Sequence, residues 1–137
     1  MPKLDSAGFE VLEEDGCYEL LGQSSLGRVG VTMDALPAIF PVNYALIELQ
    51  IVFSTGHGTK LTAALNAAVV AFEADFVNEQ GTEAWSVQAI GRAILVDPGS
   101  DLEAAAKVAV RALAPVPRRF LVKIRPARIS GRRLLPR

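Results

Sequence analysis

The sequence predicts a mainly β (α+β) protein, a six-stranded antiparallel barrel with peripheral helices. Most of the chain falls into segments rich in β-branched and aromatic residues, several of which alternate between apolar and polar positions as strands do. All but one of the connections between these segments are short enough for hairpins or meanders. With 137 residues and no visible repeat or linker, we expect one domain over residues 1–137 with a sizeable core.

The composition excludes several classes of protein. Half of the residues are hydrophobic, yet no apolar run approaches the roughly 18 residues that a membrane span needs. The N-terminus lacks the basic start and apolar block of a signal peptide. With one cysteine, Cys17, and one histidine, His57, we expect neither a disulfide framework nor a protein-made metal site. These observations predict a soluble, cytoplasmic protein without a membrane partner.

Charge is spread unevenly along the chain, although the net charge is only −1. Six acidic residues lie in the first 19 positions, whereas eight of the 14 cationic residues lie between Arg118 and Arg137. A basic tail can bind nucleic acid. Because the overall charge is near zero and no binding motif appears, we expect no nucleic-acid partner. Pairing with the acidic N-terminus, or one charged strand face, explains the tail more simply.

The first half of the chain predicts one helix followed by three strands. Leucines spaced along a polar background indicate a short amphipathic helix that ends near Gly22. A turn lacking the usual Asn-Gly or Asp-Gly is expected at Glu48–Gln50. The predicted elements are a helix over Glu13–Gly22 and strands over Leu26–Thr32, Ala38–Ile47 and Leu49–Thr55.

The second half predicts two helices and three strands. Ser100 and Glu103 fit a capping box, which makes the following helix the best-marked one in the chain. A phase slip at Arg125-Pro126 indicates a bulge in the last strand. The predicted elements are helices over Gly58–Asn66 and Ser100–Leu113, and strands over Ala67–Asp75, Trp85–Val96 and Arg119–Gly131. One face of the long strand is formed by Trp85, Val87, Ala89, Gly91, Ala93 and Leu95.

Pro41 lies inside the predicted strand Ala38–Ile47. Proline has no N–H for a strand ladder, so it belongs at a bulge or an edge. The following residues, Val42, Asn43 and Tyr44, are then expected on bent, locally unpaired backbone whose amides can hydrogen-bond a planar heterocycle. An edge bulge in which Asn43 is satisfied internally is an equally weighted alternative.

The stretch Phe53–Leu61 predicts an anion site. An apolar run ends in two hydroxyls, Ser54 and Thr55, breaks at glycines and enters a helix carrying Lys60. Hydroxyls, main-chain N–H groups and a lysine at a helix N-terminus suit phosphate. The alternative is an ordinary strand-to-helix turn, with Thr59 as the N-cap and Lys60 in solvent. Further along, Glu73 and Asp75 share a strand face, for which we expect solvent or a paired cation.

These segments, taken in order, resemble the pyridoxamine 5′-phosphate oxidase-like superfamily, the FMN-binding split β-barrels. The likeness covers about residues 15–133 and is nearest to small actinobacterial and nitroimidazole-resistance-type members. The motifs that carry it are Phe40-Pro-Val-Asn-Tyr44, Phe53-Ser-Thr-Gly-His-Gly-Thr-Lys60-Leu61, Phe72-Glu-Ala-Asp75, Trp85-Ser-Val, Gly91-Arg92 and Ile129-Ser-Gly-Arg132.

The resemblance implies a homodimer with FMN at the subunit interface. It assigns the phosphate to the turn containing Phe53, Ser54, Thr55, Gly58, Thr59 and Lys60. It places the isoalloxazine edge along Pro41, Val42, Asn43 and Tyr44, and it brings Trp85 and Ser86 to the flavin or the partner subunit. For His57 we prefer the role of a helix-entry residue near the phosphate to that of a proton-transfer group. No catalytic residue is assigned.

The sequence also departs from the family. Pyridoxamine phosphate oxidases proper carry an arginine and a lysine on the strand that here reads Phe40-Pro-Val-Asn-Tyr-Ala, and a C-terminal tryptophan that is missing here. We therefore expect a flavin-dependent oxidoreductase for an unknown small molecule, not a true pyridoxamine phosphate oxidase. The alternatives are a relative that binds F420 or haem, and a non-enzymatic dimer that binds or sequesters flavin.

Overall fold

The computed structural model describes residues 1–55, 58–110 and 120–135, and for residues 58–60 it describes the main chain. Its described strands form one antiparallel sheet in the order β1-β7-β4-β3-β2-β5-β6, and β6 pairs with β7 to close a six-stranded barrel. The predicted barrel is therefore confirmed. The strands are β1 (Glu10–Val11), β2 (Leu26–Met33), β3 (Leu36–Ile47), β4 (Gln50–Thr55), β5 (Val69–Val77), β6 (Ala84–Leu95) and β7 (Phe120–Arg133).

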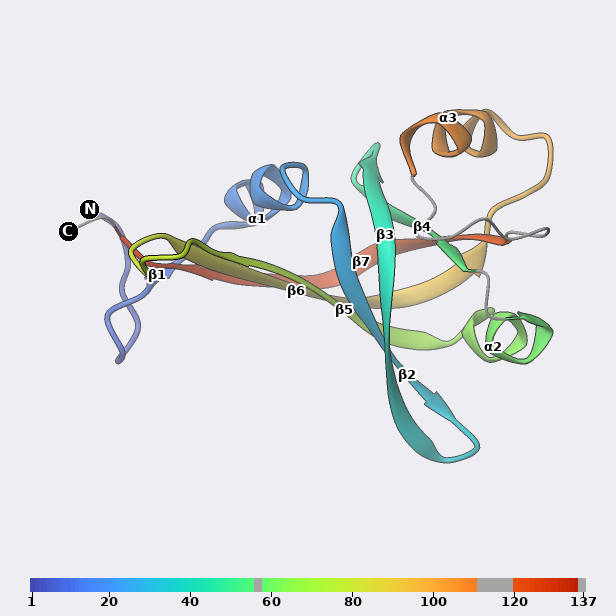
Figure 1. The fold of residues 1–137 in the computed structure, drawn as a ribbon, viewed down its shortest axis with the longest axis horizontal. Helices are drawn as coiled ribbons and strands as arrows, with labels where there is room; N and C mark the ends of the chain where they lie inside the picture. The colour runs from blue at the N-terminus through green and yellow to red at the C-terminus, as the bar shows by residue number, and fades with distance from the viewer. Residues whose placement is uncertain (56–57, 111–119, 136–137) are drawn as a thin grey trace.

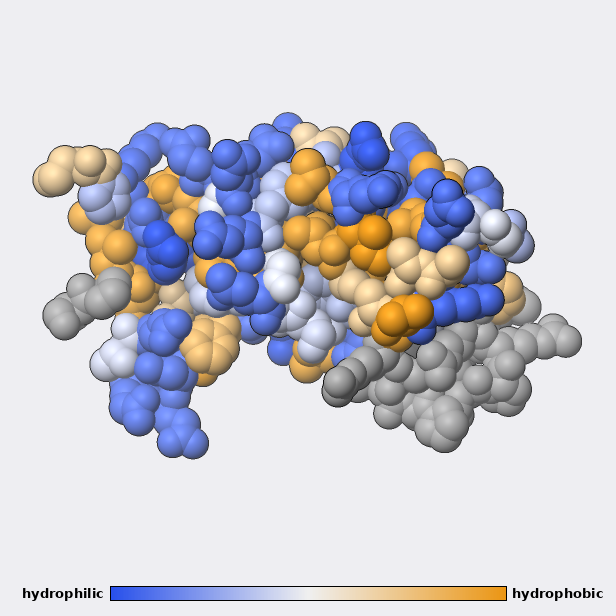
Figure 2. Space-filling view, turned by 90° about the horizontal axis from the view of Figure 1, so that it is seen from above, coloured by the Kyte–Doolittle hydropathy of each residue, from blue (hydrophilic) through white to orange (hydrophobic). Residues whose placement is uncertain are grey.

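Three helices lie outside the barrel wall, as Figure 1 shows. Two of them, α1 (Glu14–Leu21) and α3 (Asp101–Ala109), lie on the same side of the sheet, and α2 (Gly58–Leu65) lies near one end of the barrel. No helix in the described ranges is long and apolar enough to cross a membrane. Figure 2 views the α1 and α3 side, where polar and apolar surface alternate.

Alternating strand residues fill the barrel. On β6, Trp85, Val87, Ala89 and Ala93 are all buried, so the predicted shared face of this strand is the one inside the barrel. Where β2 and β5 meet, the barrel is narrow: a Cβ on Gly27 would lie 2.4 Å from Cζ of Phe72. Only glycine allows this close approach. The Phe72 ring in turn packs edge-to-face on Tyr44, with centroids 4.8 Å apart.

Two hairpins turn without glycine. Asp34 and Ala35 connect β2 to β3 with φ of 51° and 64°, and Glu48 and Leu49 connect β3 to β4 with φ of 51° and 61°. Positive φ at both central residues is the geometry that continues the twist of the flanking strands. The turn expected at Glu48–Gln50 is confirmed, although Gln50 already belongs to β4.

The capping box of α3 is confirmed, but the predicted end of this helix is not. Oγ of Ser100 accepts the N–H of Glu103 at 3.1 Å, and Oε1 of Glu103 accepts the N–H of Gly99 at 3.1 Å. The helix ends at Ala109 because Val110 is extended, with φ −92° and ψ 117°. Its side chain packs in the cluster that α3 forms with the barrel, and this burial overrides the helical periodicity. The rest of the predicted helix, 111–113, lies outside the described residues.

β7 contains the predicted bulge. Ile90 pairs with Arg128 and Gly91 pairs with Pro126, so Ala127 is the extra residue. The strand runs to Arg133, two residues beyond the prediction. Its basic end pairs with the acidic N-terminus, as expected: Nε of Arg132 lies 3.1 Å from Oδ2 of Asp5, and Nη2 of Arg133 lies 2.7 Å from Oε1 of Glu10.

Candidate functional site

The barrel opens between β3 and β4. β3 pairs with β2 from Leu36 to Asn43, but with β4 only from Tyr44 to Ile47. β4 continues past this point along β7, where Ser54 and Thr55 pair with Leu121 and Phe120. The two strands therefore separate after the Tyr44–Phe53 pair, and Figure 1 shows them diverging, with α2 beyond the end of β4. We call this opening the β3–β4 split.

Pro41 lies on the β3 side of the split. The Tyr44 N–H donates to the Ser25 carbonyl at 2.9 Å. Because main-chain groups along a strand point alternately to its two neighbours, the residues two and four positions before Tyr44 also direct their N–H and C=O groups toward β2. Pro41 belongs to the other set, which faces away from β2, and its missing N–H removes no bond to that strand. The edge position predicted for Pro41 is confirmed. The alternative of a bulge is wrong, because the β2–β3 register runs unbroken through the Arg28–Pro41 pair. The expected locally unpaired backbone is also wrong, since Val42 and Asn43 pair with Gly27 and Leu26.

The other side of the split leads into a helix N-terminus. α2 begins at Gly58, three positions after Thr55, and the main chain of Thr59 and Lys60 forms its first turn. The first N–H groups of a helix have no partner within the helix and carry its positive end. The side chains of Thr59 and Lys60, and the whole of His57, lie outside the described residues. Their proposed roles stay predictions.

The structure separates the other predicted site residues by burial. Val42, Tyr44, Phe53, Thr55 and Trp85 are buried, so within one chain they can offer only main-chain groups at the surface. The remaining four are partly or fully accessible. Asn43 and Ser54 are half-buried, and Pro41 and Ser86 are exposed.

Tyr44 has a structural role of its own. Its ring is 2% exposed, and its hydroxyl donates to the Leu21 carbonyl at 2.7 Å, tying the end of α1 to β3. Burial raises the pKa of Tyr44 to about 12. The side chain therefore belongs to the core.

Tyr44→Phe is expected to lower the free energy of unfolding by about 1–3 kcal/mol, since it leaves the buried Leu21 carbonyl without this donor. Urea denaturation of both proteins measures the difference. Tyr18→Phe is the matched control, because Tyr18 lies on α1 and is only half-buried. Equal losses in the two variants would show that the Tyr44 hydroxyl contributes nothing specific.

Ser54 faces outward, beneath α3. It lines a cavity of about 220 Å³ together with Leu121 of β7 and Glu103 and Lys107 of α3. Nζ of Lys107 lies 3.4 Å from Oε1 of Glu103, so this ion pair borders the cavity that Ser54 lines. The sequence analysis missed Lys107. The sequence predicts that Lys107 lies on the helix, but it does not predict that α3 packs over β4.

Ser86 is not brought to the split within one chain. Pro41 pairs with Arg28, Arg28 with Glu73, and Glu73 with Gln88, so β3 and β6 are three strands apart. At about 4.8 Å per spacing this separation is about 14 Å along the sheet. Ser86 lies two residues further along β6 on the same outer face.

The surface between them contains the predicted carboxylate pair. Nη1 of Arg28 lies 3.1 Å from Oε1 of Glu73 and 3.6 Å from Oδ1 of Asp75, which confirms the cation-paired face. A cavity of about 320 Å³ adjoins these groups and is lined also by Ile39 and Gln88. Burial, followed by the neighbouring Asp75, raises the pKa of Glu73 from 4.5 to about 7, against the opposing effect of Arg28.

This raised pKa predicts a pH dependence of stability. The folded chain holds the Glu73 proton more tightly than the unfolded chain, so the free energy of unfolding falls as pH rises from about 4.5 to about 7. Glu73→Gln is expected to reduce that fall. Urea titrations of both proteins at pH 5 and pH 8 make the comparison, and an unchanged pH dependence in the variant would contradict it.

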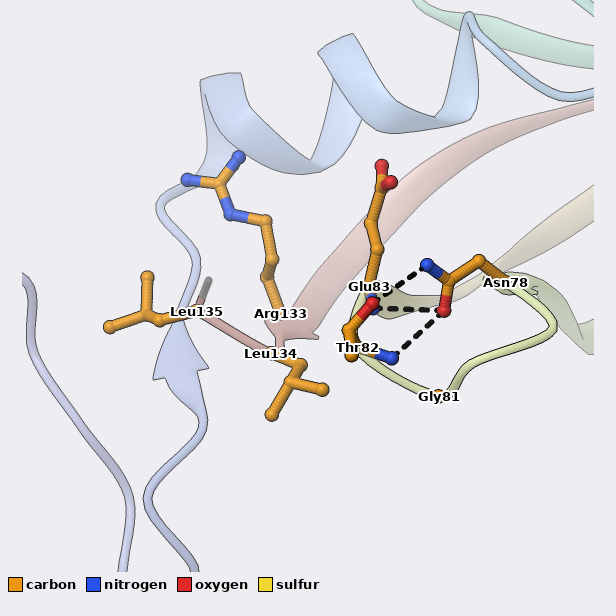
Figure 3. A pocket seen from close by; sticks show the side chains of 7 residues that line it. All are labelled: Asn78, Gly81, Thr82, Glu83, Arg133, Leu134 and Leu135. Atoms are coloured by element: carbon orange, nitrogen blue, oxygen red, sulfur yellow. Dashed lines mark hydrogen bonds between the residues drawn. The ribbon is translucent and has the colours of Figure 1, made fainter. Parts of the chain in front are cut away.

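A cavity of about 1000 Å³ lies at the opposite end of the sheet, between the β5–β6 loop and the end of β7 (Figure 3). The β5–β6 loop is held by hydrogen bonds between its own residues: Oδ1 of Asn78 accepts the N–H groups of Thr82 at 2.9 Å and Glu83 at 3.0 Å. None of the predicted site residues lines it. The β3–β4 split, not this cavity, adjoins the predicted residues of β3 and the end of β4.

The closed barrel and its opening between β3 and β4 define a split β-barrel protein. The sequence model of the pyridoxamine 5′-phosphate oxidase family matches residues 13–133. The chain belongs to this family, as its motifs implied.

The chain is also similar to individual relatives in sequence and in structure. The uncharacterised protein Rv0080 of Mycobacterium tuberculosis is 36% identical over 93 residues, which cover 64% of this chain and 61% of that one. A FAD-binding protein from Mycobacterium smegmatis is 33% identical with a TM-score of 0.74, covering 90% of this chain and 96% of its own. A putative pyridoxamine 5′-phosphate oxidase from Corynebacterium glutamicum is 33% identical with a TM-score of 0.80, covering 91% and 97%.

Proposed function

We propose that this chain binds a flavin in the β3–β4 split and acts as a flavin-dependent oxidoreductase on a small molecule. The observation that carries the proposal is the divergence of β3 from β4 where β4 leads into the N-terminus of α2. A phosphate suits the helix N-terminus, and a planar ring suits the strand edge. The similarity to a FAD-binding protein supports the same class of cofactor.

The first turn of α2 and the edge of β3 are the parts of the split proposed to hold such a group. The first turn of α2, with Thr59 and Lys60, would hold the phosphate, and Lys60 would supply the positive charge. The main chain of Pro41–Asn43 would lie along the ring edge. FMN is the simplest flavin that meets these requirements. FAD shares its ring and first phosphate, so the split suits the common part of both.

When bound, the flavin supplies the hydride or electron chemistry. The chain's own residues position the ring, limit the access of water and shape the space for the substrate. No acid or base from the chain is needed for this role. The substrate of pyridoxamine phosphate oxidases proper is not proposed, because this sequence lacks their arginine and lysine on the strand that reads Phe40-Pro-Val-Asn-Tyr-Ala.

A second copy of the chain would complete the site. Ser86 lies about 14 Å from β3 along the sheet, too far to touch a ring held at the split of the same chain. The outer face between them exposes apolar side chains, with Leu26 at 46%, Ile39 at 73% and Val69 at 63%. Such a surface suits a subunit contact. We therefore propose a homodimer in which Ser86 approaches the partner's flavin.

Ser86→Arg tests the dimer. Ser86 is exposed between Asp75 of β5 and Arg132 of β7, so an arginine there meets one charge of each sign in the isolated barrel. A bulky charge in a subunit contact is expected to weaken dimerisation and flavin binding at least about tenfold. Sedimentation and flavin titration measure both, with the exposed Ser6→Arg as the control. A variant that remains a dimer with full flavin affinity would remove Ser86 from the interface.

Turnover separates an enzyme from a flavin carrier. The flavin-loaded protein is reduced anaerobically and mixed with a panel of quinone and nitroaromatic acceptors, and reoxidation is followed by absorbance. Oxidation faster than that of free reduced flavin with at least one acceptor is the expected result. Reoxidation no faster than free flavin across the panel would favour a binding or sequestering role.

A further inference from the structure

A separate cavity of about 470 Å³ lies on the outer face of the barrel where β4, β6 and β7 meet. The residues that matter in its lining are Gln50, Arg92, Ile94, Lys123 and Arg125. None of them belongs to the proposed flavin site. Gln50 stands four residues before Ser54 on β4, which is about 13 Å along the strand.

Three cations converge on this cavity without a carboxylate. Arg92 and Arg125 are directly opposed across β6 and β7, and Lys123 lies two residues from Arg125 on the same face. Directly opposed like charges destabilise a sheet unless something compensates them. No ion pair joins Arg92, Lys123 or Arg125 to an acidic residue in the described part of the chain.

Two of these residues are held in place by the fold. Nη1 of Arg92 donates to the carbonyl of Ala67, which leaves other donors of its guanidinium for a ligand. Arg125 lies at the start of the β7 bulge, where a Cβ on Gly91 would come 2.6 Å from its carbonyl oxygen. Bulges commonly re-aim side chains, and this one fixes the main chain that carries Arg125.

Gln50 supplies an independent indication. Gln50 is only 8% exposed, and it lines this cavity beside the three cations. No buried side-chain nitrogen or oxygen of the described residues lacks a hydrogen-bond partner, and the Gln50 amide, as part of the cavity lining, can donate a hydrogen bond to a ligand there. An oxyanion there would accept that hydrogen bond and neutralise the opposed arginines together.

We propose that this cavity binds a small molecule carrying a phosphate or diphosphate group. Arg92, Lys123 and Arg125 supply charge, and Gln50 donates a hydrogen bond to an oxygen of the ligand. Ile94, 44% exposed, forms an apolar wall for the body of the molecule. The volume accommodates a ligand of nucleotide size or smaller. The site is separate from the flavin site and does not depend on it.

Calorimetric titration of the full-length Lys60→Ala chain with inorganic pyrophosphate, inorganic phosphate and ADP tests the proposal. The Lys60→Ala background removes the lysine at α2 as a competing phosphate site. Saturable binding of pyrophosphate at one per chain is expected, and tighter binding of ADP would identify a nucleotide as the source of the phosphate. Tighter binding of an oligonucleotide than of pyrophosphate or ADP would overturn a small-molecule site.

Charge-removing variants locate the binding. Arg125→Gln and Lys123→Gln are each expected to weaken pyrophosphate binding at least about tenfold, and Gln50→Leu is expected to weaken it less. Arg128→Gln, which removes an exposed charge of β7 outside the cavity lining, is the matched control and should leave binding unchanged. No saturable binding, or equal losses in Arg128→Gln and Arg125→Gln, would overturn the proposal.

Discussion

Phe72→Ala is expected to lower the free energy of unfolding by about 3–5 kcal/mol, the range for truncating a buried phenylalanine. The Phe72 side chain is 1% exposed and packs edge-to-face on Tyr44. It also fills the space beside Gly27, where a Cβ would lie 2.4 Å from Cζ of Phe72. Removing the ring would leave a cavity between β2 and β5 that the closed sheet cannot collapse to fill.

Chemical denaturation of the wild-type and variant proteins measures this loss. Phe76→Ala is the matched control, since Phe76 lies on the same strand and is 43% exposed. It is expected to cost less than about 1 kcal/mol, because an exposed ring loses little contact. Equal losses at the two positions would contradict the proposed packing of the barrel interior.

Lys60→Ala is expected to weaken flavin binding by about 1.5–3 kcal/mol, the range for a hydrogen bond to a charged group. The prediction follows from the sequence and from the main chain, which places Lys60 in the first turn of α2. Titrating the apoprotein with FMN, followed by the quenching of flavin fluorescence, gives the two affinities.

The controls distinguish a phosphate contact from a general effect of charge. Lys3→Ala removes an exposed lysine at the N-terminus and should leave the affinity unchanged. Lys60→Arg keeps the charge and should retain most of the binding. An unchanged affinity in Lys60→Ala would place the phosphate elsewhere.

Most of the fold could be predicted because its signals are local. The alternation from Trp85 to Leu95 identified the residues that share one face of β6, and Ser100 with Glu103 identified the start of α3. The bulge in β7 followed from a phase slip near Pro126. Each signal depends on neighbouring residues alone, and the structure confirms each of them.

The errors arose where distant segments decide the outcome. Val110 leaves the helix because it packs beside Val52, a residue far away in the sequence. Pro41 needs no bulge because its imide nitrogen faces away from β2, which depends on the register. Lys107 and Ser54 line the same cavity only because α3 packs on the barrel. The split was expected from the family resemblance, and the β3–β4 register gives its place.

The measurement that most directly tests the central claim is the visible spectrum of the purified protein, followed by titration of the apoprotein with FMN and FAD. We expect the two absorption bands of an oxidised flavin, or their appearance on reconstitution, with saturation at one flavin per chain. A single F420-type band would assign the site to a deazaflavin, and a Soret band would assign it to haem. A colourless protein that binds neither flavin would contradict the account.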